Sequence, residues 1–182
     1  FLWILGSLPV FTIGASTTAA MSVALKLADD EEGYIGKSYF EAYKANFKQG
    51  VPMGLIFLVA WYAVYLDFEL FEKLEGNPFI CLVMGILAIA IGISGFMYSY
   101  ALLARYENSF INTMKNSFEI YTRYFGRSIV MTAIVALEVV VMFWNTTTMY
   151  FMILIGPACI IYTISAGALY IFKDIERKEK EG

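Results

Sequence analysis

Long apolar segments separated by short charged ones dominate the sequence. Residues 1–25 carry no charged side chain, and further apolar runs cover about residues 51–71, 79–104, 129–145 and 149–172. A helix needs about 17 to 25 mostly apolar residues to cross a bilayer, so each run is long enough to span a membrane. The pattern predicts an all-α, polytopic membrane bundle of five to six spans.

The first apolar run leaves the number of spans open. Residues 6–9 and 12–14 are rich in Gly and Pro and place a turn in its middle, and a hydroxyl at residues 16–17 could cap a new helix. These signals favour a hairpin, in which the end of a first helix is followed by a tight turn and a short second helix to about Ala28. A single kinked span is the alternative. It is favoured mildly by the internal repeat described below, which aligns this run with the unbroken apolar run before Arg105.

A short motif occurs twice. Residues 40–47 read Phe-Glu-Ala-Tyr-Lys-Ala-Asn-Phe and residues 118–125 read Phe-Glu-Ile-Tyr-Thr-Arg-Tyr-Phe, so four of eight positions match. Each copy lies between apolar runs, which is typical of an internal repeat. Two spans separate the copies, so the repeats should be parallel. The predicted single domain, residues 1–182, comprises repeat 1 at about 1–72, repeat 2 at about 79–148, a final span at about 149–172 and a tail at 173–182.

Both motif copies are predicted to form amphipathic helices, the first ending near Gly50 and followed by Pro52 in the first turn of the next span. At 3.6 residues per turn the aromatic side chains share one face and the charged side chains lie away from it. A lipid surface suits such helices and is the favoured interpretation, and a groove on a partner would suit the same face. The candidate docking residues are Phe40, Tyr43, Phe47, Phe118, Tyr121 and Phe125.

The distribution of Lys and Arg predicts the orientation in the membrane. Of the 13 basic residues, all but Lys73 fall on one side of the predicted spans. The positive-inside rule places that side in the cytoplasm. Both motif helices and the C-terminal tail should therefore be cytoplasmic, and the acidic turn at residues 67–78 should lie outside.

Composition excludes several kinds of chemistry. The chain is 59% hydrophobic and 16% charged, as expected for an integral membrane protein, and its net charge of −3 comes without a polybasic patch for nucleic acid. Histidine is absent, and Cys81 and Cys159 lie singly in apolar runs, where buried free thiols are expected. A Cys/His metal site and a histidine-dependent triad are excluded. No catalytic residue, metal or cofactor is predicted.

Glu138 is the candidate proton or ligand site because it lies near the centre of an apolar run. An unpaired carboxylate there costs at least about 2.5 kcal/mol, so it should face the bundle and be paired, hydrogen-bonded or protonated. A structural hydrogen bond and a functional site both stay open. Replacement by Leu should destabilise the bundle or abolish activity by leaving a partner unsatisfied. The nearest expected partners are the hydroxyl groups of Ser94, Tyr98, Ser99 and Tyr162.

Small residues and aromatic residues suggest how the spans pack and where they end. Small side chains at close-packing spacing predict an internal helix contact, with a dimer seam and hence a homo-oligomer as the alternative. These helix-packing candidates are Ala88, Gly92, Gly95 and Ser99. An outer aromatic belt, rather than a sugar platform, is predicted at Trp61, Tyr62, Tyr65, Trp144 and Tyr150.

The first third of the chain resembles a known family. The similar segments are residues 8–14, 24–27, 31–33 and 39–50. They resemble the YesL-like family of bacterial integral membrane proteins of unknown function, whose genes often neighbour those of carbohydrate ABC-transporter components. The resemblance implies a bacterial cell membrane location and an association with sugar uptake, and it carries no catalytic motif.

Two functions are predicted from these observations. The first is a non-enzymatic accessory protein that docks the permease or ATPase subunits of a carbohydrate ABC uptake transporter. The alternative is a small membrane transporter or channel with Glu138 in its pathway. The chain itself does not match an ABC permease, because the signature Glu-Ala-Ala followed three residues later by Gly is missing after Glu41-Ala42.

Overall fold

The computed structural model describes residues 1–31, 33–73 and 79–181, without the side chains of residues 72, 80 and 81. Every regular element in these ranges is helical, which confirms the all-α prediction. Glu32, the 74–78 part of the acidic turn and the Cys81 thiol lie outside this description. The elements are α1 (Leu2–Ser7), η1 (Val10–Thr12), α2 (Ile13–Ala28), α3 (Ile35–Lys73), α4 (Phe79–Arg105), α5 (Phe110–Arg123), α6 (Phe125–Met142) and α7 (Thr146–Glu181).

Five helices in the described ranges are long and apolar enough to cross a membrane. They begin at Val10, Ile35, Leu82, Phe125 and Thr146. The span formed by η1 and α2 is the most enclosed. In its most apolar segment 61% of the residues are buried inside the protein, against 11–33% in the other four spans. Apolar side chains cover the outer surface of the other spans, as expected for helices that face lipid. The chain is thus a polytopic membrane protein with α2 at its centre.

The N-terminal hairpin is present. Helix α1 has only six residues and folds back on α2 through the short turn at η1. Trp3 Nε1 donates a hydrogen bond to Thr17 Oγ1 at 3.1 Å, and Ser16 Oγ donates to the Trp3 carbonyl at 2.8 Å. These bonds satisfy polar groups that the apolar surroundings would otherwise leave unpaired. The alternative of one kinked span through residues 1–28 is therefore wrong.

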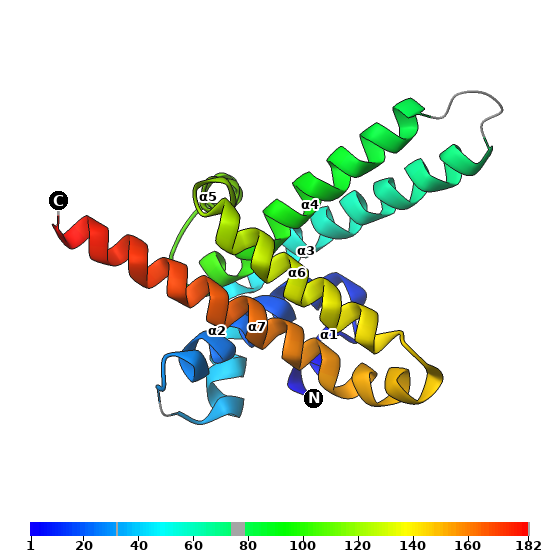
Figure 1. Ribbon diagram of the computed structural model, residues 1–182. Coiled ribbons are helices and arrows are strands. Elements are labelled where there is room, and N and C mark those ends of the chain that lie inside the picture. The colour runs from blue at the N-terminus through cyan, green and yellow to red at the C-terminus, as the bar shows by residue number, and fades with distance from the viewer. Residues whose placement is uncertain (32, 74–78, 182) are drawn as a thin grey trace.

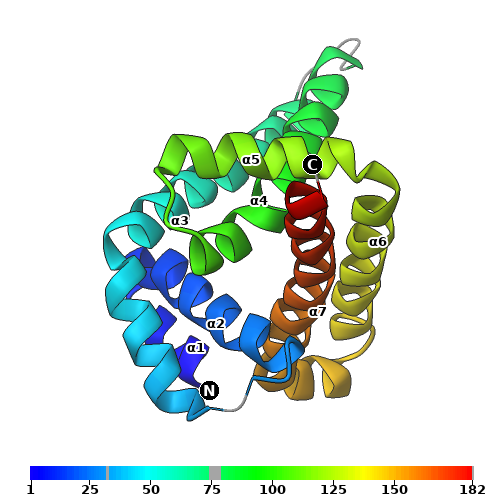
Figure 2. The same ribbon diagram turned by 90° about the vertical axis from the view of Figure 1, so that its left-hand side faces the viewer.

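Helix α3 corrects the predicted break near Gly50. It runs without interruption through Pro52, and Figure 2 shows that it changes direction along its length. A proline inside a helix removes one backbone hydrogen bond and bends the helix, but tertiary packing can hold both halves together. Here Gly50 and Gly54 pack directly on the backbone of α2.

The second motif copy differs from the first, because it is broken. Helix α5 ends at Arg123, Tyr124 has φ −108° and ψ 37°, and α6 begins at Phe125. Phe125 therefore opens a span, which corrects the prediction that it belongs to the amphipathic helix. In Figure 1 α5 is seen almost end-on while α7 runs across the view, so α5 lies crosswise to the final span.

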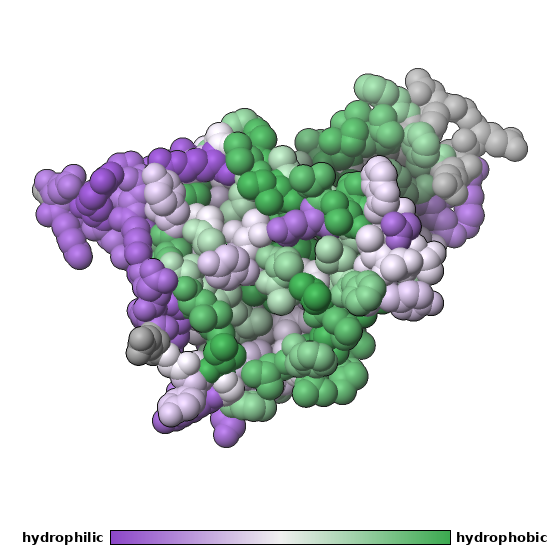
Figure 3. Space-filling model, turned by 60° about the horizontal axis from the view of Figure 1, so that its bottom comes forward, coloured by the Kyte–Doolittle hydropathy of each residue, from purple (hydrophilic) through white to green (hydrophobic). Residues whose placement is uncertain are grey.

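The basic residues of the C-terminal tail and their acidic partners gather at one end of the molecule. Figure 3 shows a large hydrophilic region around the C-terminal tail, smaller hydrophilic groups near the middle and at the opposite end, and apolar side chains over much of the rest of the visible face. In Figure 2, which looks toward that end, α5 passes beside the tail of α7, and the first half of α3 lies on the left, across α2 from that tail. Both motif copies therefore border the polar end, as expected for helices at a membrane surface.

Candidate functional site

Each motif copy exposes one phenylalanine pair. Phe40 and Phe47 are 55% and 38% exposed, and Phe118 and Phe125 are 52% and 57% exposed. Phe40 and Phe47 are seven residues, or two turns, apart on α3, so they form a row on one side of that helix. Phe118 on α5 and Phe125 on α6 lie on either side of the break at Tyr124. Tyr43 and Tyr121 do not join these exposed pairs, because both are half-buried. Only four of the six predicted docking residues thus face outward.

The residue just before each motif attaches its helix to the bundle. Tyr39 is buried, and its hydroxyl lies 2.8 Å from Ser16 Oγ on α2. Ser117 is also buried, and its Oγ donates to the carbonyls of Ser94 and Gly95 on α4 at 2.9 and 3.0 Å. The bonds from Tyr39 to Ser16 and from Ser117 to Ser94 both join positions 23 residues apart. Sequence reasoning missed these anchors, although the two residues occupy the same place before each motif.

A cluster that we call the polar clamp joins the ends of three helices. Arg105 Nε and Nη2 donate to the two Glu176 carboxylate oxygens at 3.1 and 3.3 Å, and Arg105 Nη1 lies 3.9 Å from Asp29. Tyr106 donates to Glu176 at 2.5 Å, and Lys173 pairs with Asp29. Burial, with help from the Glu176 carboxylate, raises the pKa of Tyr106 to about 12, so this phenol stays protonated and donates. The clamp fixes the tail of α7 to α2 and α4.

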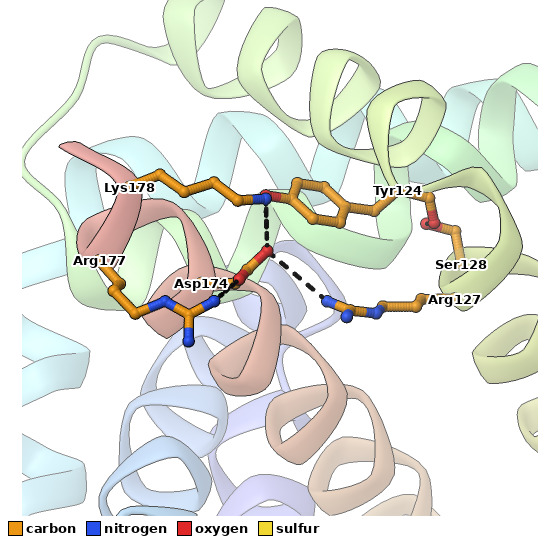
Figure 4. A network of polar contacts seen from close by, with 6 residues as sticks. All are labelled: Tyr124, Arg127, Ser128, Asp174, Arg177 and Lys178. Atoms are coloured by element: carbon orange, nitrogen blue, oxygen red, sulfur yellow. Dashed lines mark hydrogen bonds and ion pairs between the residues drawn. The ribbon is translucent and has the colours of Figure 1, made fainter. Parts of the chain in front are cut away.

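A second polar cluster, the Asp174 network, lies beside the clamp (Figure 4). The Asp174 carboxylate is 2.8 Å from Arg177, 2.9 Å from Lys178 and 3.8 Å from Arg127. Tyr124 donates to the same carboxylate at 3.2 Å. Three cations therefore surround one carboxylate, which leaves an excess of positive charge at this end of α6 and α7.

Glu138 makes a hydrogen bond of the predicted kind with an unpredicted residue. Thr163 Oγ1 on α7 donates to Glu138 Oε1 at 2.6 Å, whereas Oε2 is buried without a hydrogen-bond partner in the described ranges. The expected hydroxyl partners bond elsewhere or are exposed: Ser94 to Ile91, Tyr98 to Ser128 and Ser99 to Gly95, with Tyr162 49% exposed. A half-satisfied carboxyl group in a span is costly, so it marks a functional candidate.

The predicted small-residue contact is only partly present. Gly95 and Ser99 are buried beside Met114 of α5. Ala88 is half-buried, and a Cβ added to Gly92 would meet no described atom within 4 Å. Gly92 therefore does not bring two helices together within this chain, which corrects the prediction for that residue.

The tightest helix crossing lies elsewhere, between α2 and α3. A Cβ on Gly54 would lie 2.7 Å from the Gly14 nitrogen, and one on Gly50 would lie 2.8 Å from the Ala15 Cα. Such distances leave no room for any side chain. The Gly50-xxx-Gly54 spacing is a known signal for close helix packing, and it could have been found in the sequence.

The remaining candidates lie on the outer surface. Cys159 is exposed, which corrects the expected buried thiol. The proposed belt residues are exposed as well, at 44% for Trp61, 62% for Tyr62, 59% for Tyr65, 76% for Trp144 and 66% for Tyr150. Within the described parts of the chain, no three His, Cys, Asp or Glu side chains are grouped so that they could hold a metal ion.

These features define a helical, multi-span membrane protein whose polar clusters and motif helices gather at one end. A family model described as "Protein of unknown function, DUF624" matches residues 1–68, from α1 to five residues before the end of α3. The same region carries the YesL-like resemblance. No curated protein and no solved structure matches the chain.

Proposed function

We propose that the protein is a non-enzymatic accessory subunit of a carbohydrate ABC uptake transporter in a bacterial cell membrane. The observation that carries the proposal is the exposure of the two phenylalanine pairs, Phe40 with Phe47 and Phe118 with Phe125. Large aromatic side chains in the open are typical anchors for a partner surface. The class of transporter rests on the YesL-like resemblance.

The charges around the phenylalanine pairs favour a protein partner. Lys44 and Lys48 are exposed on the same helix as Phe40 and Phe47, and Glu119 and Arg123 are exposed next to Phe118. A mixed-charge rim around an apolar centre is the usual anatomy of a protein interface. The permease or ATPase subunits would supply the apolar pockets, and the lipid surface is the competing occupant.

A pull-down tests the docking role. We expect that changing Phe40 and Phe47, or Phe118 and Phe125, to Ser lowers recovery of co-expressed permease and ATPase subunits at least about tenfold. Each buried Phe contributes roughly 1.5–3 kcal/mol, and a tenfold change corresponds to about 1.4 kcal/mol. Tyr43 and Tyr121 stay unchanged, since both pack inward. Tyr62→Ser with Tyr65→Ser, on exposed aromatics of the opposite end of α3, is the matched control. Unchanged recovery from both phenylalanine variants would leave lipid anchoring as their role.

We further propose that the two halves are parallel repeats. The support is a pair of equivalent hydrogen bonds, one between Tyr39 and Ser16 and one between Ser117 and Ser94, each joining residues 23 positions apart. Tyr39 and Ser117 directly precede the two motif copies. Met53 and Met131, which follow their motifs at the same distance, are both buried. The halves differ where α3 is continuous and the second copy breaks at Tyr124.

The proposed orientation places the polar end and the C-terminus in the cytoplasm. In a variant with Cys81 and Cys159 replaced by Ala, we expect Lys44→Cys to be protected from a membrane-impermeant maleimide in intact cells and Lys73→Cys to react. Both lysines are exposed, so access depends on the side of the membrane. Opening the cells should expose position 44. Equal labelling of both positions in intact cells would reject this topology.

A small transporter or channel is the second candidate function. The observation in its favour is the Glu138 carboxyl group, which is held by one hydrogen bond from Thr163 and has a second buried oxygen without a partner in the described ranges. A carboxyl group in a span that could take up and release a proton is typical of transport pathways. The effect of its removal on stability separates a structural role from this one.

A further inference from the structure

The outer side of the α6–α7 pair carries an apolar groove. Its volume is about 690 Å³, and it is bounded by Gly126, Val130 and Ile134 on α6 and by Thr163, Ala166 and Tyr170 on α7. The two helices close its floor where Met131 packs against Gly167. In a membrane protein such a groove is open to the acyl chains of the bilayer.

The mouth of the groove is positively charged. Arg127 lines it, with its guanidinium 4.7 Å from the Tyr170 ring centre and its side chain 47% exposed. Arg177 and Lys178 lie around the same carboxylate, Asp174, and both approach it more closely than Arg127 does. Figure 4 shows all three cations around Asp174, and one carboxylate can neutralise only one of them. Arg127, the most distant of the three at 3.8 Å, can therefore pair with a second anion as well.

The position of Arg127 in α6 matches the depth of a lipid headgroup. Helix α6 has 18 residues, or about 27 Å at 1.5 Å per residue, which is close to the thickness of the hydrocarbon core. Arg127 lies in its first turn, at the polar end, and the groove continues from there toward Thr163 in the membrane. A charged group therefore lies at the interface directly above an apolar channel.

We propose that this groove is a binding site for one anionic phospholipid. The phosphate pairs with Arg127 within the field of Arg177 and Lys178, and an acyl chain lies between α6 and α7. Basic residues at the cytoplasmic ends of spans are a known basis for selection of anionic lipids. The site is argued without the accessory or transport function, because the phosphate contact uses neither the phenylalanine pairs nor Glu138. Thr163, which bonds to Glu138, lines only the far end of the groove.

Native mass spectrometry of the intact, detergent-purified chain tests the site. Phosphatidylglycerol and phosphatidylcholine with identical acyl chains are added in turn, and the retained lipid is counted. We expect retention of phosphatidylglycerol to exceed that of phosphatidylcholine by about fivefold, the effect of one basic residue near a lipid phosphate. Arg127→Gln should abolish this preference, and Arg123→Gln, on α5 outside the groove, should keep it.

Two further variants separate lipid binding from a structural effect. A Cβ on Gly126 would meet no described atom within 4 Å, so Gly126→Leu should fill the groove without disturbing the fold and should lower retention of both lipids. Asp174→Asn should raise retention of phosphatidylglycerol, because it removes the carboxylate that competes with the phosphate. Equal retention of the two lipids by the parent chain, or no change in both Arg127→Gln and Gly126→Leu, would overturn the proposal. Displacement by excess glycerol phosphate would also overturn it, since a simple anion would then suffice.

Discussion

Replacement of Gly54 by Val is expected to cost about 3 kcal/mol of stability, at the upper end of what overpacking usually costs. A Cβ at this position would lie 2.7 Å from the Gly14 nitrogen and 2.8 Å from its Cα. Both atoms belong to the backbone of α2, which cannot move aside as a flexible side chain can. Because α2 is the most enclosed span and also contacts α4 and α7, a shift of α2 would disturb the whole bundle.

Thermal unfolding in a mild detergent, followed by tryptophan fluorescence, measures this effect. Gly54→Ala should already lower the midpoint clearly, and Gly54→Val should lower it further. Gly92→Ala is the matched control, since it adds the same methyl group to a span where no described atom lies within 4 Å. It should be neutral or stabilise by up to about 1 kcal/mol through helix propensity. If Gly54→Ala and Gly92→Ala unfold at the same midpoint, the close crossing of α2 and α3 does not exist.

The glycine crossing shows where sequence patterns reach their limit. The pair Gly50 and Gly54 has the small-xxx-small spacing, but Ala88 and Gly92 in α4 have it too, and a Cβ on Gly92 would meet no described atom within 4 Å. Spacing reveals which helices can approach closely and not which helices do. The choice depends on Gly14, which lies in another helix, and only the fold brings it to Gly50 and Gly54.

Local patterns predicted the spans better than they predicted the connections. The apolar runs and the turn at residues 6–14 are local features, and both appear in the structure. Pro52 is a local signal as well, but packing of its neighbours on α2 overrides the break that it predicted. The polar clamp was missed for the opposite reason, because Arg105 and Glu176 lie 71 residues apart and no periodicity connects them.

The motif helices fall between these cases. Their amphipathic pattern identified the aromatic residues, but it could not say which of them face the bundle. Tyr39 and Ser117, whose hydroxyl groups bond to α2 and α4, turn each helix so that Phe40 and Phe118 point outward. The orientation of an amphipathic helix is thus set by a polar contact that lies outside its apolar stripe.

Glu138→Leu is expected to stabilise the protein by about 1–3 kcal/mol, which reverses the expectation from sequence. A carboxyl group in a span is costly, and here one oxygen is buried without a partner in the described ranges. The lost partner, Thr163, would not remain unsatisfied, because a threonine in a helix can donate to the carbonyl four residues back. Thr18 and Thr132 already do so in this chain, at 2.9 and 2.8 Å.

The same unfolding assay measures this change, with Glu138→Gln as the control. The Gln variant keeps an oxygen that can accept from Thr163 and removes only the capacity to ionise, so its midpoint should stay close to that of the parent. A clear loss of stability in Glu138→Leu would show that the carboxyl group is a structural link between α6 and α7. A gain would mean that the parent chain carries the carboxyl group at a cost to its own stability. Such a cost is characteristic of functional sites, and it would favour the transport pathway through Glu138.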